Sequence, residues 1–258
     1  MLFPARGILR SRLIESNFLP MRSFVYHTPE LVPSEPMPDC AVVIDVLRAT
    51  TTIAAALANG AEAVQAFADL QELNEVSEHW PADKRIRCGE RGGKQVDGFD
   101  IGNSPFDFTP EVVGGKRIFM STTNGTRSLS RVAESPVMVT ASFSNISSVK
   151  HFLRERAFEK VWFVGSGWEG SFSLEDTVCA GALVHLLDSD FGNDEAVAAA
   201  ALYRVWADNL VGLFELASHG KRLLALDKRK DLAYCAEFDT VAVLPIQVSP
   251  GVLALAKE

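Results

Sequence analysis

The sequence alternates between short runs of β-branched and aromatic residues and longer stretches with helical spacing, which constrains the fold more than any other feature. Most of the apolar runs are continuous, which is typical of strands covered by helices on both faces. The predicted strands are 41–46, 63–67, 85–88, 117–121, 137–140, 161–165 and 240–246. The predicted helices are 51–59, 70–80, 125–133, 145–156, 174–188 and 194–217. This order predicts an α/β fold of three layers around a largely parallel or mixed sheet.

A strand, a threonine-rich turn and a helix occur at 41–59 and again at 117–133, a pattern consistent with an internal duplication. No linker rich in Pro, Gly or Ser divides the chain, so we expect one α/β domain over residues 23–258. Residues 1–22 stand apart, with four arginines and one acidic residue. They are either a transit-like N-terminal extension or the result of a start codon assigned too early, with Met21 as the working start.

Composition excludes several classes of protein. The net charge is −8, from 25 Lys and Arg against 33 Asp and Glu. A nucleic-acid-binding protein normally presents a basic face, so we expect no nucleic acid partner. No run of about 18 apolar residues is present, so we expect no membrane span. The four cysteines form no CxxC pair, which indicates reduced thiols and a cytoplasmic location. Neither HExxH nor GxSxG occurs, so a zinc hydrolase and an α/β-hydrolase are unsupported.

Ligands of open α/β sheets bind beyond the carboxyl ends of the strands, where four polar segments of this sequence are predicted to lie. The first is DVLRATTT, residues 45–52. Asp45 ends a strand, Arg48 follows, and Thr50, Thr51 and Thr52 open a helix. Hydroxyls and free amides at a helix start form an anion site, and an arginine adds a bidentate contact. The alternative is a threonine cap beside a solvated arginine.

The second segment is GERGGKQVDGFDIGNSP, residues 89–105, with five glycines. Glu90 and Asp100 supply hard oxygen atoms, whereas Arg91 and Lys94 supply positive charge. A long polar loop of this kind suits Mg²⁺ and an anion together. A plain surface loop is the alternative.

The third and fourth segments also follow strands. STTNGTRS, residues 121–128, repeats the logic of hydroxyls and a glycine at a helix start, and its Arg127 faces either a ligand or water. In VGSGWEGSFSLEDTVCAG the glycines have GxGxxG spacing. We reject a dinucleotide site there, because Ser173 and Asp176 form a capping box that starts the helix after the glycines. Glu175 and Asp176 either cap that helix or face a metal.

The four segments, in this order, resemble the signature blocks of the 2-phosphosulfolactate phosphatases, and DLAYCAEFDTVAVLP (residues 231–245) resembles the C-terminal block of that family. The resemblance covers residues 24–245. It implies a three-layer α/β fold, self-association into a homo-oligomer, and Mg²⁺-dependent hydrolysis of (2R)-2-phospho-3-sulfolactate to 3-sulfolactate and phosphate. In some archaea that reaction leads to coenzyme M. The alternatives are a phosphatase of a related phosphorylated hydroxy acid, a nucleotide-dependent enzyme and a non-catalytic binder of such acids.

Roles follow from the residue types in the four segments. The predicted catalytic residues are Asp45, Arg48 and Glu90. The predicted metal ligands are Asp45, Glu90, Asp100, Glu175 and Asp176. The predicted phosphate and substrate contacts are Thr50, Thr51, Thr52, Arg91, Lys94, Asn103, Thr122, Thr123, Asn124, Gly125, Thr126, Arg127, Ser166 and Gly167. We favour in-line displacement by water over a covalent phosphate on Asp45, because the DxD of haloacid-dehalogenase-type nucleophile loops is missing.

Overall fold

The computed structural model describes residues 20–256, which contain eleven strands and ten α-helices. The strands are β1 (Arg22–Tyr26), β2 (Cys40–Ile44), β3 (Ala63–Ala66), β4 (Arg85–Arg91), β5 (Lys94–Gln95), β6 (Arg117–Ser121), β7 (Val137–Ala141), β8 (Lys160–Gly165), β9 (Asp190–Phe191), β10 (Pro245–Ser249) and β11 (Val252–Leu255). The helices are α1 (Ala49–Ala58), α2 (Leu70–Glu78), α3 (Pro110–Val113), α4 (Gly125–Arg131), α5 (Ile146–Glu155), α6 (Leu174–Leu187), α7 (Asp194–Trp206), α8 (Leu210–Leu216), α9 (Ser218–Ala225) and α10 (Arg229–Cys235). Short 3₁₀ helices form at Pro29–Leu31, Ala82–Lys84, Pro105–Asp107 and Phe143–Asn145. Of the predicted N-terminal extension, 1–22, residues 1–19 lie outside the described residues. Strand β1 begins at Arg22, the last residue of that extension.

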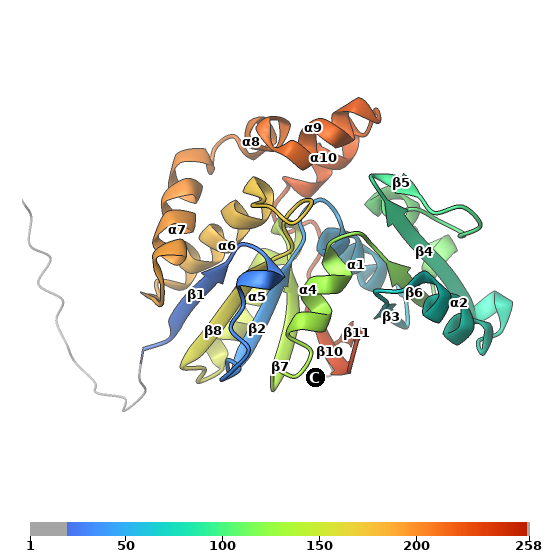
Figure 1. The fold of residues 1–258 in the computed structure, drawn as a ribbon, viewed down its shortest axis with the longest axis horizontal. Coiled ribbons are helices and arrows are strands. Elements are labelled where there is room, and N and C mark those ends of the chain that lie inside the picture. The colour runs from blue at the N-terminus through green and yellow to red at the C-terminus, as the bar shows by residue number, and fades with distance from the viewer. Residues whose placement is uncertain (1–19, 257–258) are drawn as a thin grey trace, which may run out of the picture.

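The described strands form one mixed sheet in the order β5-β4-β6-β3-β11-β10-β7-β2-β8-β1-β9. Strands β7, β2, β8, β1 and β9 are parallel to one another, and β3, β6 and β4 form a second parallel group. The antiparallel hairpin of β10 and β11 joins the two groups in the middle of the sheet. This arrangement, shown in Figure 1, confirms the predicted α/β fold around a largely parallel, mixed sheet.

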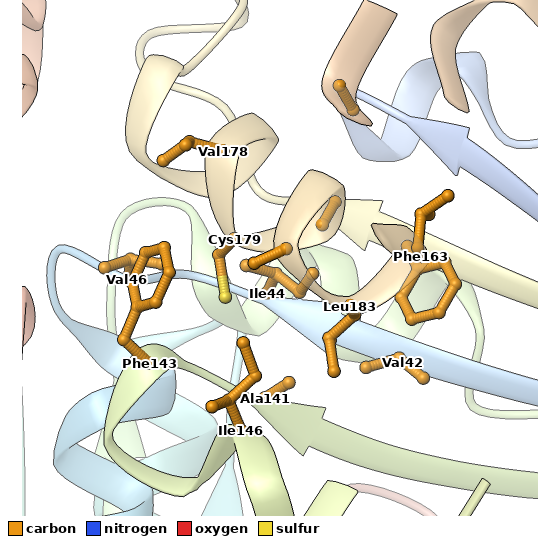
Figure 2. Close-up of a cluster of buried hydrophobic side chains, with 14 of the residues drawn as sticks. Val42, Ile44, Val46, Ala141, Phe143, Ile146, Phe163, Val178, Cys179 and Leu183 are labelled. Carbon is orange, nitrogen blue, oxygen red and sulfur yellow. The ribbon is translucent and has the colours of Figure 1, made fainter. Parts of the chain in front are cut away.

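Helix α6 covers one face of the larger group. Val42 and Ile44 of β2 and Phe163 of β8 pack there against Cys179 and Leu183 of α6, and all five side chains are buried (Figure 2). Alternate residues of β2 face opposite sides of the sheet, as the pleat requires. The strand is therefore apolar throughout because each of its faces is covered, which explains its continuous pattern in the sequence.

The helices that follow β2 and β6 cross between the two groups. Helix α4 follows β6, yet it packs against β2, where Leu129 joins the buried cluster that contains Ala41 and Val43. Helix α1 follows β2 and packs against β3, β7 and β10. The turns at the starts of α1 and α4 are therefore neighbours, although they belong to different parallel groups. This crossing brings the first and third polar segments together. The internal duplication stays a prediction.

Two predicted elements are wrong in the C-terminal part. No strand forms over 240–244; the strand there is β10, from Pro245 to Ser249. The predicted helix 194–217 is two helices, because the side chain of Asn209 accepts a hydrogen bond from the Gly212 amide at 3.0 Å and starts α8. Within the described residues, no single helix has the length and apolar composition to cross a membrane. Helices α7 and α8 meet both criteria only when they are counted together, and they are bent by 116° relative to each other.

Helices α8, α9 and α10 gather over the end of the sheet at which β1 and β2 terminate (Figure 1). Helix α9 reaches the hairpin of β4 and β5, where the Arg222 side chain donates two hydrogen bonds to the Gly92 carbonyl at 2.9 and 3.0 Å. Gly93 packs so tightly on this helix that a Cβ there would lie 2.6 Å from the Leu226 side chain. The C-terminal helices therefore bridge the two parallel groups above the polar segments.

Candidate active site

Asp45 lies where β2 ends and α1 begins, and the starts of two helices hold its side chain. The Ala49 amide donates to Oδ1 at 3.1 Å. Gly125, the first residue of α4, comes so close that a Cβ there would lie 2.7 Å from Asp45 Oδ2. Position 125 therefore requires glycine. The carboxylate sits between the first turns of α1 and α4, where negative charge is favoured.

The three threonine hydroxyls at the start of α1 all have main-chain partners. Thr50 Oγ1 donates to the Asp45 carbonyl at 2.8 Å, and Thr51 Oγ1 donates to the Val46 carbonyl at 2.9 Å. Thr52 Oγ1 donates to the Asn103 carbonyl at 3.2 Å. These hydroxyls, which the sequence predicts as substrate contacts, fix the turn around Asp45 and tie it to the loop after β5.

Arg48 is buried and crosses to the C-terminal helices. Its Nη1 pairs with Asp231 of α10, and its Nη2 lies 3.4 Å from the Gly93 carbonyl. The second oxygen of Asp231 accepts from Ser104 Oγ at 3.1 Å. A buried guanidinium requires such a partner, because an unpaired charge in the interior is strongly destabilising. Asp231 therefore positions Arg48.

Glu90 comes near the end of β4, just before the tight turn into β5. Gly92 and Gly93 have φ angles of +59° and +85°, which favour glycine and close the hairpin. The Gly93 amide donates to Glu90 Oε1, and Thr123 Oγ1 lies 3.3 Å from Oε2. The hairpin turn and the third polar segment thus orient this buried carboxylate together.

These side chains surround one pocket between the two parallel groups. Its lining residues are Asp45, Leu47, Arg48, Glu90, Asn103, Thr122, Asn124 and His219. The free space is only about 10 Å³, roughly the room for one water molecule or ion. Among the described residues, Asn103 Oδ1 and Thr122 Oγ1 are buried and have no hydrogen-bond partner. Buried polar atoms are normally satisfied, so these two indicate a site for a polar ligand.

Asp176, near the start of α6, connects the ends of two strands. Its Oδ1 accepts from the Val46 amide at 2.8 Å. Its Oδ2 accepts from the amides of Ser166 and Gly167 at 3.1 and 3.2 Å. Three main-chain amides thus share this carboxylate, which holds the first and fourth polar segments in one arrangement. Ser166 Oγ is itself buried and has no partner among the described residues.

Glu175 and His219 form a second buried pair beside the pocket. His219, in the first turn of α9, has its Nδ1 3.5 Å from Glu175 Oε1. Its ring stacks on Trp168, with ring centroids 3.8 Å apart and an interplanar angle of 16°. The predicted metal ligand Glu175 therefore faces a histidine, and the fourth polar segment, through Trp168, packs on α9.

Two buried carboxyl groups of this region, those of Asp45 and Asp176, have raised pKa values. Burial raises the pKa of Asp45 to about 6; the charge of His219 and the Ala49 amide oppose the rise, and the charges of Glu90 and Glu175 add to it. Burial and then the charges of Asp45 and Glu175 raise the pKa of Asp176 well above its ordinary value. The pocket therefore concentrates negative charge away from water, which a cation would relieve.

Of the five predicted metal ligands, Glu90, Glu175 and Asp176 lie close enough to Asp45 to interact with it electrostatically, and Asp100 lies apart. Asp100 is exposed and accepts a hydrogen bond from the Arg87 amide at 2.7 Å, and Asp176 serves main-chain amides. Within residues 20–256, no group of three or more His, Cys, Asp and Glu is placed to hold a metal ion. The carboxylates of the described residues therefore form no such group by themselves, and the predicted metal ligands stay a prediction.

An oxygen-donor set of mixed type does line the pocket. Asp45 and Glu90 contribute carboxylates, and Asn103 and Thr122 contribute the two partnerless oxygen atoms. Mg²⁺ takes oxygen ligands, retains several waters and often binds through one or two carboxylates. These residues and the small enclosed space fit such an ion.

The remaining predicted contacts divide between the pocket and its surroundings. Asn124 lines the pocket, and Thr126 Oγ1 donates to the Thr122 carbonyl at 2.9 Å. Arg91 donates to Ser121 Oγ at 2.9 Å, at the end of β6. Lys94 is exposed on β5.

Arg127 lies away from the pocket. It pairs with Glu30, its side chain is 45% exposed, and it lines a separate cavity with Arg131. The sequence analysis missed His219 and Asp231. A lone histidine gives no signal, whereas Asp231 opens the predicted C-terminal block, which was the only indication of its importance.

Comparison with known proteins gives one consistent result. The family model described as 2-phosphosulpholactate phosphatase matches residues 26–250. A protein of Synechococcus sp. (strain JA-3-3Ab) is 61% identical over 241 residues, which cover 92% of this chain and 100% of the relative. A Synechocystis sp. protein is 58% identical over 241 residues, and a Nostoc punctiforme protein is 56% identical over 246 residues. Each match covers 92% of this chain and 100% of the relative. All three relatives carry the name probable 2-phosphosulfolactate phosphatase.

Proposed function

The chain belongs to the 2-phosphosulfolactate phosphatase family, and from this premise we propose that it hydrolyses (2R)-2-phospho-3-sulfolactate to 3-sulfolactate and phosphate. The observation that carries the proposal is the meeting of Asp45, Arg48 and Glu90, from two sequence-distant segments, in one buried pocket. Its partnerless polar atoms on Asn103 and Thr122 support a ligand rich in oxygen.

Arg48 is the pocket's guanidinium, and we assign to it the phosphoryl oxygens of the substrate. Asp231 and the Gly93 carbonyl hold it in place, so little conformational entropy is lost when the anion binds. Arginine placed against a transferring phosphoryl group stabilises the charge that develops on its oxygens.

Mg²⁺ is part of the proposal, with Asp45, Glu90, Asn103 and Thr122 as the residues that would hold it. When bound, the ion neutralises phosphoryl charge and makes water more acidic. In the favoured reaction, a water oxygen forms a bond to phosphorus as the bond from phosphorus to the ester oxygen breaks. Asp45 or Glu90 accepts the water proton, and the 3-sulfolactate oxygen leaves with the electron pair of the broken bond and is then protonated.

The rival reaction passes through a covalent phosphate on Asp45. Acid quenching during turnover, borohydride reduction and mass spectrometry distinguish the two. A label on Asp45 would contradict direct attack by water. With a substrate whose phosphoryl group is made chiral by oxygen isotopes, inversion of configuration at phosphorus would support it, whereas retention would indicate two successive displacements through Asp45.

The decisive experiment measures phosphate release from (2R)-2-phospho-3-sulfolactate by the full chain, with Mg²⁺ and with a chelator. We expect release with the metal and its loss with the chelator. 2-Phospholactate and 2-phosphoglycerate test the alternative of a related hydroxy acid. Binding of (2R)-2-phospho-3-sulfolactate without release of phosphate would instead identify a non-catalytic binder. Thermal stabilisation by ATP or NAD, and not by this compound, would favour the nucleotide-dependent alternative.

The other expectations belong to the same proposal. They are a cytoplasmic location, a homo-oligomer, no nucleic acid or membrane partner, and coenzyme M synthesis as the route that the product enters. Light scattering of the purified protein tests the oligomer. Growth and metabolite analysis of a deletion strain test the route of the product.

A further inference from the structure

A strongly basic segment lies beside the pocket of this acidic protein. Five of the chain's 25 Lys and Arg fall between residues 218 and 230, against one acidic residue, Asp227. They are Lys221, Arg222, Lys228, Arg229 and Lys230. The segment forms α9 and the start of α10, which lie over the end of the sheet at which β2 terminates (Figure 1). His219 of α9 lines the pocket. The chain as a whole carries −8, so positive charge is concentrated here.

A cavity of about 820 Å³ opens next to this segment. Its charged lining residues are Lys228, Arg229 and Lys230 and the three carboxylates of Asp107, Asp227 and Asp231. Asp231 separates it from the pocket: one carboxylate oxygen accepts from Ser104 at 3.1 Å, and the other holds Arg48. The pocket has room for about 10 Å³ only, so the bulk of a substrate requires space outside it. The adjoining cavity offers that space.

The outer cavity and the pocket interact electrostatically. Burial raises the pKa of Asp107, and the positive charges of Lys228 and Arg48 both oppose this rise. One carboxyl group thus feels the outer lysine and the pocket arginine. Arg229 is paired with Glu215, whereas, in the part of the chain that the structure describes, Lys228 and Lys230 have no ion-pair partner. The charge of Lys230 is therefore available to an incoming anion, whereas the charge of Lys228 also acts on Asp107.

On the premise of the proposed phosphatase reaction, we propose that Lys228 and Lys230 attract the anionic substrate into the outer cavity and deliver it to Arg48. The substrate carries phosphate, sulfonate and carboxylate groups, which the net charge of the protein repels at long range. A local cluster of one sign beside a site raises the concentration of the oppositely charged ligand there and its rate of association, typically by 10–10³-fold. The two lysines act on encounter and do not take part in the chemistry.

The test is the double variant Lys228→Glu, Lys230→Glu, assayed with (2R)-2-phospho-3-sulfolactate. Acidic residues are favourable at the start of α10, so this variant should fold. At an ionic strength of about 20 mM we expect kcat/KM to fall about tenfold, with kcat unchanged within about twofold. At about 0.5 M salt the difference should shrink to about twofold, because screening shortens the range of the charges.

The matched control is Lys84→Glu, Lys116→Glu, which changes the net charge equally. Lys84 directly precedes β4 and Lys116 directly precedes β6, at the amino ends of these strands. We expect less than a twofold change in kcat/KM for this control. Equal losses in both variants, a loss that persists at high salt, or a loss in kcat would each overturn the inference. Wild-type protein without phosphatase activity would instead refute the proposed function.

Discussion

The two strand–turn–helix units, β2–α1 and β6–α4, share a local plan but contribute differently to the pocket. The first unit buries two charges there, Asp45 and Arg48, and uses its threonine hydroxyls on its own main chain. The second contributes the partnerless hydroxyl of Thr122 and close main-chain approach at Gly125, and its arginine, Arg127, pairs with Glu30 at the surface. Two units of similar local sequence therefore line the pocket differently: β2–α1 forms a charged wall, and β6–α4 forms a neutral wall.

The position of each arginine relative to its helix explains much of this difference. Arg48 directly precedes the first residue of α1, and its side chain lines the pocket. Arg127 is the third residue of α4, and its side chain leaves on the face that lines a separate cavity. A shift of a few residues across a helix start thus moves an arginine from the pocket to the surface.

The largest effect should come from removing the carboxylate of the first unit. Asp45→Asn should lower kcat about 10³-fold, because the pocket loses a base and an oxygen ligand. Its unfolding temperature without metal should nevertheless rise by a few degrees at neutral pH. The amide retains the oxygen that accepts from Ala49 and removes a buried charge among Glu90 and Glu175. Phosphate-release kinetics and calorimetry measure both effects.

Asp83→Asn is the control for that substitution, because Asp83 is exposed in the 3₁₀ helix before β4. It should change neither activity nor stability appreciably. Retention of more than about a tenth of wild-type kcat by Asp45→Asn would remove Asp45 from the reaction.

The two arginines provide the next test. Arg48→Ala should lower kcat/KM by at least about 10²-fold and cost about 3–5 kcal/mol of stability, because Asp231 is left as an unpaired buried charge. Arg127→Ala should cost at most about 1 kcal/mol, since its pair with Glu30 is nearly half-exposed. Its kcat/KM should stay within about twofold of wild type. Urea unfolding and steady-state kinetics separate the two variants, and similar losses of activity would place both arginines on the substrate.

Two buried threonines, one from each unit, should show smaller and opposite effects: one substitution lowers stability, and the other raises KM. Thr51→Val removes a hydroxyl that is bonded to the Val46 carbonyl, so it should cost about 1 kcal/mol with little change in KM. Thr122→Val removes a partnerless hydroxyl that lines the pocket, so stability should be retained while KM rises about tenfold. If Thr51→Val alone raised KM, its hydroxyl would have to leave the main chain when substrate binds.

Most strands and helices of the fold could be predicted because they depend on the local pattern of apolar and polar residues. The continuous apolar run of β2 indicates burial on both faces, and six of the seven predicted strands correspond to β2, β3, β4, β6, β7 and β8. The break before α8 was missed because it depends on the cap that Asn209 provides, within a sequence that is otherwise helical. The strand predicted at 240–246 was displaced because an apolar run by itself does not fix where pairing begins.

The candidate site was predictable in its segments and not in the directions of its side chains. Asp45, Arg48 and Glu90 meet in the pocket. The three antiparallel pairings between the two groups make β2 and β4 run in opposite directions, so the rule about carboxyl ends does not by itself predict this meeting. Which hydroxyls remain free depends on how α1 and α4 cross. His219 enters from α9, far away in sequence, and only the assembled fold brings it there. The predicted roles of these residues in catalysis and metal binding stay predictions.

The final test uses pH and concerns the charge of the first unit alone. The pKa of Asp45 is raised from 3.8 to about 6 in the folded protein, so the folded state holds this proton more tightly than the unfolded state. The stability contributed by the proton is complete below about pH 4 and is lost as the pH rises through about 6. In metal-free protein, the gap in unfolding temperature between Asp45→Asn and wild type should therefore be near zero at pH 4 and widen until about pH 6. Above that the gap should stay constant and correspond to a difference in unfolding free energy of about 3 kcal/mol. Mg²⁺ should narrow the gap at pH 7.5 by stabilising the wild type, whereas Thr51→Val should show the same difference from wild type at every pH. A gap that does not change between pH 4 and pH 7 would mean that Asp45 titrates normally, and the contrast between a charged and a neutral wall would lose its physical basis.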